Sequence, residues 1–536
     1  MAVSAETSSS TDKEQSAQTT HALSVAALIM MGSVLLSRVI GLFREIILAR
    51  YGGTSFEMDA YVTSFIIPEL LNHFLAGGFL SITFIPIFQK HLVNNREDLA
   101  WRTFSNLFII GTMVFGVILP ISVYFVPEIL TLLGPRINDP QSYPLTVRLT
   151  RIILPAQLFF YWGALLSAVQ MAQKKFFLPA LAPLGYNMGI ILGGYFLGSR
   201  MGIEGFAWGV LGGAFFGNFV LQISGALQCG MRLYPVCDFR DADLRNYLKK
   251  TIPLILGLGM VFSNEIFFRF FGSFLSEGAT SSVNYALRTT MMLVAIFGQA
   301  SGVASYPFLT KLAAEKKFGE MEQLLHSVLR KIAVYLLPLS AVFFVCAHPV
   351  IALLYQRGRF TEQSTHETAA VFMVYLAGTF AFSAYFIVAR AFYAMQNMLL
   401  PMATSTVTAI ITIPLYLLFS RYFGARGIAF AAITGSFLQC GVLYGVWAKR
   451  HGSAKMVGEI GLTIGKILIF TSAGSVVGWY LLRWFGDRIS FSNGIIENGL
   501  KIASVGTVML CVIFFLYDRF GIQQFKESFT GMIKRK

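Results

Sequence analysis

The stretch SRVIGLFRE, residues 37–45, places ionisable side chains inside an apolar run. Arg38 and Glu45 are seven positions apart and therefore share one face of a helix, and Arg44 lies on an overlapping face. One charge at the middle of a membrane costs about 2.5–3.5 kcal/mol, so these side chains should face one another or a water-filled cavity. Arginine keeps its charge where the dielectric constant is low, and its planar fork of donors suits phosphate or pyrophosphate.

Later apolar stretches carry further charged or titratable side chains: Asp59, Glu69, His73, Glu265, Arg269, Arg288 and Arg390. In a structural interpretation, the charges of the first two stretches pair with one another and hold helices together; they are Arg38, Arg44, Glu45 and Asp59. In a functional interpretation, Arg38, Arg44 and Arg288 line a cleft and bind an anion. We favour the functional interpretation for these three arginines and the structural one for Glu265, Arg269 and Arg390.

The sequence contains no set of residues typical of an enzyme. Its five cysteines lack metal-ligand spacing, and its seven histidines form no H-E-x-x-H motif. The phosphate-binding pattern G-x-x-x-x-G-K-[ST] of many ATP-driven proteins is also missing from the sequence. We therefore expect no catalytic activity, no metal and no cofactor.

The elements that must position these charges are membrane-spanning helices. Of the 536 residues, 55% are hydrophobic and 13% are charged, against roughly 25% charged residues in soluble domains. The mean hydropathy is +0.64. A helix needs about 20 mostly apolar residues to cross a bilayer. On that basis the sequence predicts fourteen spans, near 23–49, 58–88, 103–127, 149–171, 179–199, 204–228, 248–271, 280–311, 329–349, 367–394, 401–420, 427–447, 459–482 and 498–517.

The net charge of +15 is distributed unevenly over the connections between these spans. Lysines gather in alternate connections, and the remaining connections carry arginine without lysine. Because lysine-rich loops stay inside, this pattern places both chain ends in the cytoplasm. Nucleic-acid binding is not expected, since no basic helix or basic-aromatic surface accompanies the charge.

Matched proline and glycine spacings indicate an internal duplication. Pro179 and Gly202 are 23 positions apart, and Pro401 and Gly424 repeat this spacing 222 positions later. A second pair of prolines, at 86 and 307, has nearly the same offset. Two units of six spans would then point the same way through the membrane, and a cleft between them would open to either side in turn. Chance similarity between apolar segments is the alternative.

We accordingly predict an all-α polytopic membrane protein of about fourteen transmembrane helices, with two parallel-repeat six-helix lobes and two further C-terminal helices. The predicted divisions are a disordered cytoplasmic tail at 1–21, an N-lobe at 22–230, a C-lobe at 231–450, a final helix pair at 451–520 and a cytoplasmic tail at 521–536.

Several stretches together resemble the MurJ/MviN family of lipid II flippases, within the multidrug/oligosaccharidyl-lipid/polysaccharide exporter superfamily. They are SRVIGLFRE at 37–45, Asp-Ala at 59–60, the IPELL…GG…FIP pattern across 67–86, NYALR at 284–288, YQRGRFT at 355–361 and RAFYA at 390–394. The resemblance implies a fourteen-helix fold with a cationic central cavity that binds the lipid's pyrophosphate. It also implies that the last two helices, within 451–520, form a groove for the polyprenyl tail.

The predicted substrate-binding residues are Arg38, Arg44, Glu45, Asp59, Asn72, His73 and Arg288. Four of them match positions that the family uses for function: Arg38, Arg44, Asp59 and Arg288. Many family members have paired arginines where this chain has Asn72 and His73, and a glutamate where it has Gly77. We therefore expect a less cationic cavity, with His73 only partly charged near neutral pH.

The resemblance implies transport of lipid II, an undecaprenyl-pyrophosphate-linked disaccharide-pentapeptide, across a bacterial inner membrane by alternating access, for peptidoglycan synthesis. A monomer suffices for such transport, and membrane lipids and cell-wall synthesis proteins are the further expected partners. Three alternatives stay open. One is a flippase for another polyprenyl-pyrophosphate-linked glycan, and another is a multidrug exporter, whose cavity would favour acidic and aromatic groups over arginine. The third is a membrane scaffold for cell-wall enzymes, in which the charges are only structural pairs.

Overall fold

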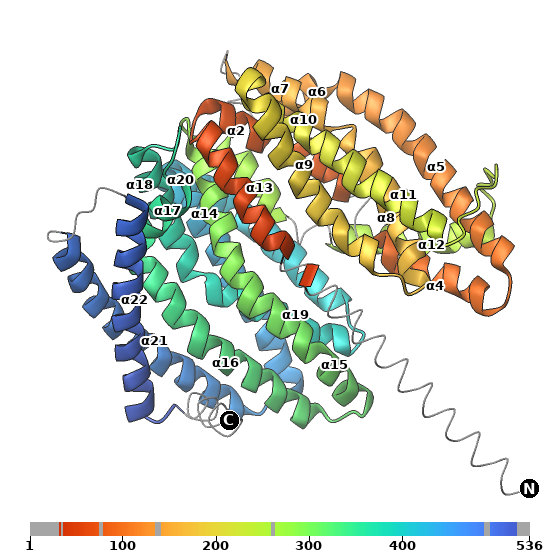
Figure 1. Ribbon diagram of the computed structural model, residues 1–536. Helices are drawn as coiled ribbons and strands as arrows, with labels where there is room; N and C mark the ends of the chain where they lie inside the picture. Colours follow the sequence, from red (N-terminus) through yellow and green to blue (C-terminus); the bar gives the residue numbers. More distant parts are fainter. Residues whose placement is uncertain are drawn as a thin grey trace, which may run out of the picture. The chain divides into compact units, whose positions relative to one another are not determined.

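The computed structural model describes residues 32–33, 36–73, 79–133, 141–258, 263–486 and 494–522, and every regular element among them is helical (Figure 1). Each predicted span overlaps a described helix. Nine of the described helices are long and apolar enough to cross a membrane, and a pair bent by 43° adds a tenth if it is counted as one span. The prediction of an all-α polytopic membrane protein is confirmed, whereas the count of fourteen stays a prediction. The predicted tail at 1–21, and all but the first two residues of the tail at 521–536, lie outside the described residues.

The chain divides into two compact units. The first unit comprises Met1–Leu48, Ser64–Leu130 and Pro144–Leu256, and the second comprises Ala49–Thr63, Thr131–Tyr143 and Gly257–Lys536. A helix over 36–52 belongs to the first unit up to Leu48 and to the second unit from Ala49. The lobe boundaries predicted above stay a prediction.

The other helices centred on the first unit are α3 (Ile66–Leu71), α4 (Phe79–Val93), α5 (Glu97–Tyr124), α6 (Val126–Leu133), α7 (Ser142–Ile153), α8 (Ala156–Ala172), α9 (Phe177–Met201), α10 (Glu204–Gly213), the π-helix η3 (Ala214–Val220), α11 (Leu221–Gln228) and α12 (Ala242–Leu258). The second unit contains α2 (Phe56–Thr63), α13 (Ser263–Gly272), α14 (Ala279–Val294), the π-helix η5 (Ala295–Gln299), α15 (Ala300–Ala314), α16 (Phe318–Val345), α17 (Ala347–Tyr355), α18 (Glu362–Ala377), α19 (Thr379–Ala394), α20 (Leu399–His451), α21 (Ala454–Gly486) and α22 (Gly494–Arg519).

The backbone repeats with the offset that the sequence predicts. Gly202 ends α9 with φ 58° and ψ −133°, and Gly424 interrupts α20 with φ 57° and ψ −134°. Glycine adopts such a conformation readily because it has no Cβ. Lys174 and Gln396, again 222 positions apart, have φ of 61° and 58°. Matched dihedral angles at matched positions confirm the duplication, and the break at Gly424 separates the two spans predicted on either side of it.

In the first unit, α9 and α10 pack backbone against backbone through glycines. A Cβ on Gly193 would lie 2.4 Å from the Cα of Gly209, and a Cβ on Gly189 would lie 2.2 Å from the Cα of Gly213. Both distances are far shorter than van der Waals contact. Small residues are the usual means of close helix packing in membranes, where burial of apolar surface alone does not drive association.

In the second unit, α21 and α22 pack on α16 (Figure 1). Val334 of α16, Ile467 of α21, and Ile513 and Tyr517 of α22 are all completely buried in one apolar cluster. Ile522, which follows α22, belongs to the same cluster. The final helix pair thus packs on the rest of the second unit through the middle of α16 and α21 and the last turns of α22.

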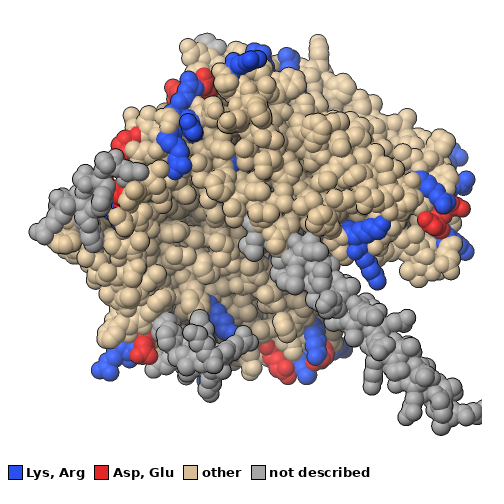
Figure 2. Space-filling model, viewed as in Figure 1, with Lys and Arg blue, Asp and Glu red and all other residues tan. Residues whose placement is uncertain are grey.

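Large apolar side chains point outward over long stretches of helix. On α20, Val407, Ile410 and Leu417 are 54%, 58% and 55% exposed. Figure 2 shows charged side chains in a few groups, separated by wide areas without any. Apolar exposure on this scale marks a surface that contacts lipid.

Gly209→Ala should destabilise the first unit, because the new Cβ would lie 2.8 Å from the Gly189 oxygen and 2.9 Å from the Ile190 Cα, both backbone atoms. We expect a cost of about 1–3 kcal/mol in the free energy of unfolding. Gly212→Ala is the matched control on α10, where a Cβ would meet nothing within 4 Å. It should be neutral or stabilising, since alanine is the better helix former. Thermal unfolding in detergent checks both, and equal midpoints would contradict the close packing.

Candidate functional site

In the first unit, two side chains hold Arg44, on the helix over 36–52. Its Nη1 donates to Oδ1 of Asn187 on α9 at 2.9 Å, and its Nη2 donates to Oε1 of Glu45 at 2.5 Å. Glu45 is only 5% exposed, whereas the Arg44 side chain is 20% exposed. The two charges neutralise each other, which lowers the cost of placing either in an apolar surrounding. An anion that reaches Arg44 must therefore compete with Glu45.

Asn187 is a functional candidate that the sequence analysis missed. Its side chain also donates to the carbonyl oxygen of Pro183 at 3.0 Å, one turn earlier in α9. This second bond fixes the orientation of the amide, so that its oxygen faces Arg44. The only signal in the sequence is an asparagine within an apolar span.

In the second unit, α2 and α14 cap each other's first turns. Asp59 of α2 accepts hydrogen bonds from the backbone N–H groups of Gly278 and Ser281, each at 2.7 Å. Glu277 accepts one at 2.9 Å from the N–H of Phe56, the first residue of α2. The N-cap of α14 is Gly278, which has no side chain to satisfy these donors. Since both carboxylate oxygens of Asp59 bind backbone, the geometry gives Asp59 a positioning role for α14.

The YQRGRFT segment packs against the same turn. The N–H of Arg359 donates to the carbonyl oxygen of Arg50 at 2.9 Å, and the Arg359 guanidinium pairs with Glu57. Gly53 and Gly358 have φ of 56° and 63°, and a Cβ on either would lie 2.4 Å from a carbonyl oxygen of the opposite segment. The two loops can approach this closely only with glycine at both positions.

Arg288, on α14, forms a bidentate ion pair with Glu265 of α13. Its Nη1 and Nη2 lie 3.2 and 3.3 Å from Oε1 and Oε2 of Glu265. Glu265 also lies 3.6 Å from Nη2 of Arg269, one turn later in α13. The Arg269 side chain is 3% exposed and the Arg288 side chain is 31% exposed. Glu265 thus pairs with two arginines. Its pair with the buried Arg269 is structural, whereas Arg288 is partly exposed.

The remaining predicted site residues lie in the first unit. Arg38 is exposed on the helix over 36–52, Asn72 is half-buried at the C-cap of α3, and His73, the next residue, is 9% exposed. Arg390 of α19 donates to the carbonyl oxygen of Gln299 in η5 at 3.0 Å, which is a structural contact. Within the part of the chain that the structure describes, no group of three or more His, Cys, Asp or Glu could hold a metal ion. The structure brings Arg44 and Glu45 together, and it places Asp59 at the start of the helix that carries Arg288.

Duplicated apolar helices, several of which carry paired charges, define the class of this protein: a multi-pass membrane protein. The family model described as lipid II flippase MurJ matches residues 48–493, and the chain therefore belongs to the MurJ lipid II flippase family. The family resemblance seen in the sequence is confirmed.

Similar proteins cover most of the chain. A probable lipid II flippase MurJ of Buchnera aphidicola subsp. Acyrthosiphon pisum is 30% identical over 403 residues, 74% of this chain and 78% of that protein. The lipid II flippase MurJ of Burkholderia cenocepacia is 27% identical over 426 residues, 78% of this chain and 82% of that protein.

Two solved structures share the fold. A lipid II flippase MurJ in an inward closed conformation superposes with a TM-score of 0.76 at 21% identity, over 92% of this chain and 100% of that one. An inward-facing multidrug resistance MATE family transporter of the MOP superfamily superposes with a TM-score of 0.65 at 12% identity, over 79% and 98% of the two chains. At these identities the likeness concerns the fold alone.

Asp59→Ala should lower the free energy of unfolding, because it removes the acceptor of two N–H groups at the start of α14. A buried donor left unpaired costs about 1–3 kcal/mol. Asp59→Asn keeps one acceptor oxygen and should lose less. Thermal unfolding in detergent ranks the variants, and an Asp59→Ala protein as stable as the wild type would exclude the capping role.

Glu265→Ala and Arg288→Ala should not be additive, because each variant removes the partner of the other side chain. For residues in direct contact, the expected coupling energy is about 0.5–3 kcal/mol. Unfolding of the two single variants and the double variant in a denaturing detergent measures it. Additive losses would show that the pair contributes nothing to stability.

Proposed function

We propose that this protein moves lipid II from the inner to the outer leaflet of the bacterial cytoplasmic membrane by alternating access. The observation that carries the proposal is the match of the family model over residues 48–493. The named relatives support it, since they align over about three quarters of the chain. The arginines supply what a lipid-linked pyrophosphate requires, which is a fixed fork of donors that stays charged at low dielectric constant.

We assign the anion contacts to Arg38, Arg44 and Arg288. In the described structure, Arg44 and Arg288 each pair with a glutamate. A pyrophosphate would take the place of that carboxylate on the guanidinium. Exchange of one anionic partner for another avoids the cost of an unpaired buried arginine, both before binding and after release. The paired glutamates therefore limit how tightly the anion is held, which a transporter needs for release.

We assign Glu45 and Asp59 to positioning. Glu45 orients Arg44 directly, whereas Asp59 acts on Arg288 through the first turn of α14. Asn72 and His73 would make polar contacts with the headgroup. The last two helices, α21 and α22, would accommodate the polyprenyl tail.

In this proposal both termini are cytoplasmic, as the lysine-rich connections predict. A membrane potential that is negative inside favours outward movement of negative charge, by about 2.3 kcal/mol per charge per 100 mV. That energy can drive an anionic substrate outward without ATP. A single chain would suffice for the cycle.

Depletion of the protein in cells, followed by an assay of lipid II accessibility at the outer leaflet, tests the function. Depletion should abolish exposure of lipid II, and wild type should restore it. Arg44→Ala should fail to restore it, and Arg44→Lys should restore it in part, because lysine keeps the charge but loses the fork. Arg200→Ala, an exposed arginine at the end of α9, is the matched control and should behave as the wild type.

Each contrary outcome has a definite meaning. Unchanged exposure of lipid II after depletion would exclude it as the substrate and favour another polyprenyl-linked glycan or a scaffold. Full rescue by the swapped double variant Arg44→Glu, Glu45→Arg would show that these charges serve only as a structural pair. The fold and the family would be unaffected by either result.

A further inference from the structure

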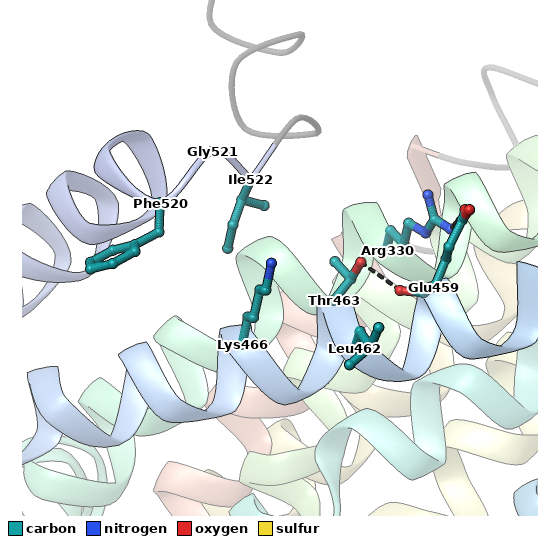
Figure 3. Close-up of a pocket in the computed structure, with 8 residues that line it drawn as sticks. All are labelled: Arg330, Glu459, Leu462, Thr463, Lys466, Phe520, Gly521 and Ile522. Carbon is teal, nitrogen blue, oxygen red and sulfur yellow. Dashed lines mark hydrogen bonds and ion pairs between the residues drawn. The ribbon is translucent and has the colours of Figure 1, made fainter.

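A pocket of about 380 Å³ lies in the second unit, where α16, α21 and the end of α22 meet (Figure 3). Arg330 of α16, Glu459 and Lys466 of α21, and Phe520 and Ile522 beyond α22 line it. None of these residues belongs to the anion contacts proposed above, although α21 and α22 are also the helices proposed to accommodate the polyprenyl tail. The pocket therefore calls for its own explanation.

The end of α22 forms a fixed wall of this pocket. Gly521 has φ 70°, and the N–H of Ile522 donates to the carbonyl oxygen of Tyr517 at 3.0 Å. A left-handed residue followed by such a bond is the Schellman arrangement of a helix C-terminus. Ile522 is 4% exposed and packs with Tyr517 in the apolar cluster on α16. Backbone and side-chain contacts thus hold the wall in place.

The pocket has more cationic groups than anionic ones. Lys466 is exposed and extends from α21 toward Gly521 and Ile522 in Figure 3. The Arg330 side chain is 18% exposed, and its Nη2 lies 3.5 Å from Oε2 of Glu459, outside the usual range of a hydrogen bond. With two cations and one carboxylate, the pocket has a net positive charge. The Nε of Arg330 is a buried donor without an acceptor among the described residues.

We expect the pocket near the level of lipid headgroups, because Phe520 and Ile522 follow the last residue of α22 and Arg330 lies at the start of the predicted span 329–349. Lys466 follows the first residue of α21 by 12 positions, which is about 18 Å along the helix axis. α21 has 33 residues and is about 50 Å long, so it exceeds a hydrocarbon core of about 30 Å. If the end of α22 marks the interface, the first turns of α21 stand outside the core, and the Lys466 side chain can reach the interface along its own methylene chain. With both termini in the cytoplasm, as proposed above, this is the inner leaflet.

We propose that this pocket binds the phosphodiester headgroup of an anionic phospholipid of the inner leaflet. Lys466 and Arg330 supply charge and donors for the phosphate. Basic pockets between transmembrane helices on the cytoplasmic side recognise anionic headgroups in this way. Leu462 and Phe520, 69% and 58% exposed, offer apolar surface for the acyl chains beside the pocket. Free phosphate has no apolar part that could contact this surface. We therefore favour a lipid over free phosphate as the ligand.

A lipid in this place would join α21 to the end of α22. Its headgroup would contact Lys466 on one helix and lie against Gly521 and Ile522 beyond the other. Since only the folded protein has this pocket, bound lipid should raise the thermal midpoint of unfolding. The lipid would therefore stabilise the helix pair on α16 independently of transport.

Native mass spectrometry of the purified full-length protein tests the proposal, with phosphatidylglycerol or phosphatidylcholine added in detergent. Phosphatidylglycerol should bind more tightly and raise the thermal midpoint. Lys466→Gln should weaken the binding of phosphatidylglycerol about fivefold, which is the contribution of one lysine to binding at an anionic membrane surface. Glu459→Gln should strengthen it, because it removes the carboxylate that competes for Arg330. Lys455→Gln, at an exposed lysine of α21 outside the pocket, is the matched control and should change little.

Equal binding of the two lipids to the wild type would overturn the proposal, as would equal losses in Lys466→Gln and Lys455→Gln. Displacement of phosphatidylglycerol by millimolar inorganic phosphate would show that the pocket takes phosphate alone, and would overturn the assignment to a lipid. If Lys466→Gln does not fold, Glu459→Gln still tests the proposal, because this variant should bind phosphatidylglycerol more tightly. Unchanged or weaker binding would overturn the proposal. Lipid binding is measured without transport, so failure here leaves the proposed flipping of lipid II untouched. The assignment to the inner leaflet rests on the proposed topology, and the binding results do not depend on it.

Discussion

The first turns of α2 and α14 depend on each other's carboxylates. Asp59 satisfies two N–H groups at the start of α14, and Glu277 satisfies one at the start of α2. The start of α14 is buried, so the protein must supply acceptors for its donors there. A Cβ on Gly278, the N-cap of α14, would lie 2.6 Å from the carbonyl oxygen of Thr54, so the two helix starts can approach this closely only with glycine there. The direction of α14, and with it the place of Arg288, follows from these contacts.

Arginines among the apolar helices are stabilised by ion pairs with glutamates. Glu45 neutralises Arg44, and Glu265 serves both Arg269 and Arg288. Such pairs gain little stability over apolar packing, which suits a role in which the arginine changes partners. A guanidinium that already has a carboxylate loses little when a phosphate replaces it. The same constraint explains why the arginines with partial exposure, rather than the buried Arg269, are the candidates for binding.

The duplicated backbone carries different chemistry in its two copies. Gly202 and Gly424 share their dihedral angles, so the turn that they form is the same in both copies. Asn187, which binds Arg44, is matched by Ala409 at the offset of 222 positions, and Ala409 has no polar side chain to offer. Backbone geometry follows from glycine positions and the lengths of apolar runs. Side-chain partners can diverge without disturbing it, as the difference between Asn187 and Ala409 shows.

Local patterns in the sequence determined the membrane class, the helical character of the predicted spans, the duplication and its break at Gly424, because hydropathy and glycine spacing act over one or two helices. They also singled out Arg44, Glu45, Asp59 and Arg288 as charges that needed partners. Only the tertiary structure decided which partners these are. Asp59 binds backbone groups 219 and 222 positions away, Arg44 binds an asparagine 143 positions away, and Arg288 shares Glu265 with Arg269. A carboxylate is paired equally well by an arginine or by two N–H groups, so the choice depends on which group the packing of distant helices brings within about 3 Å.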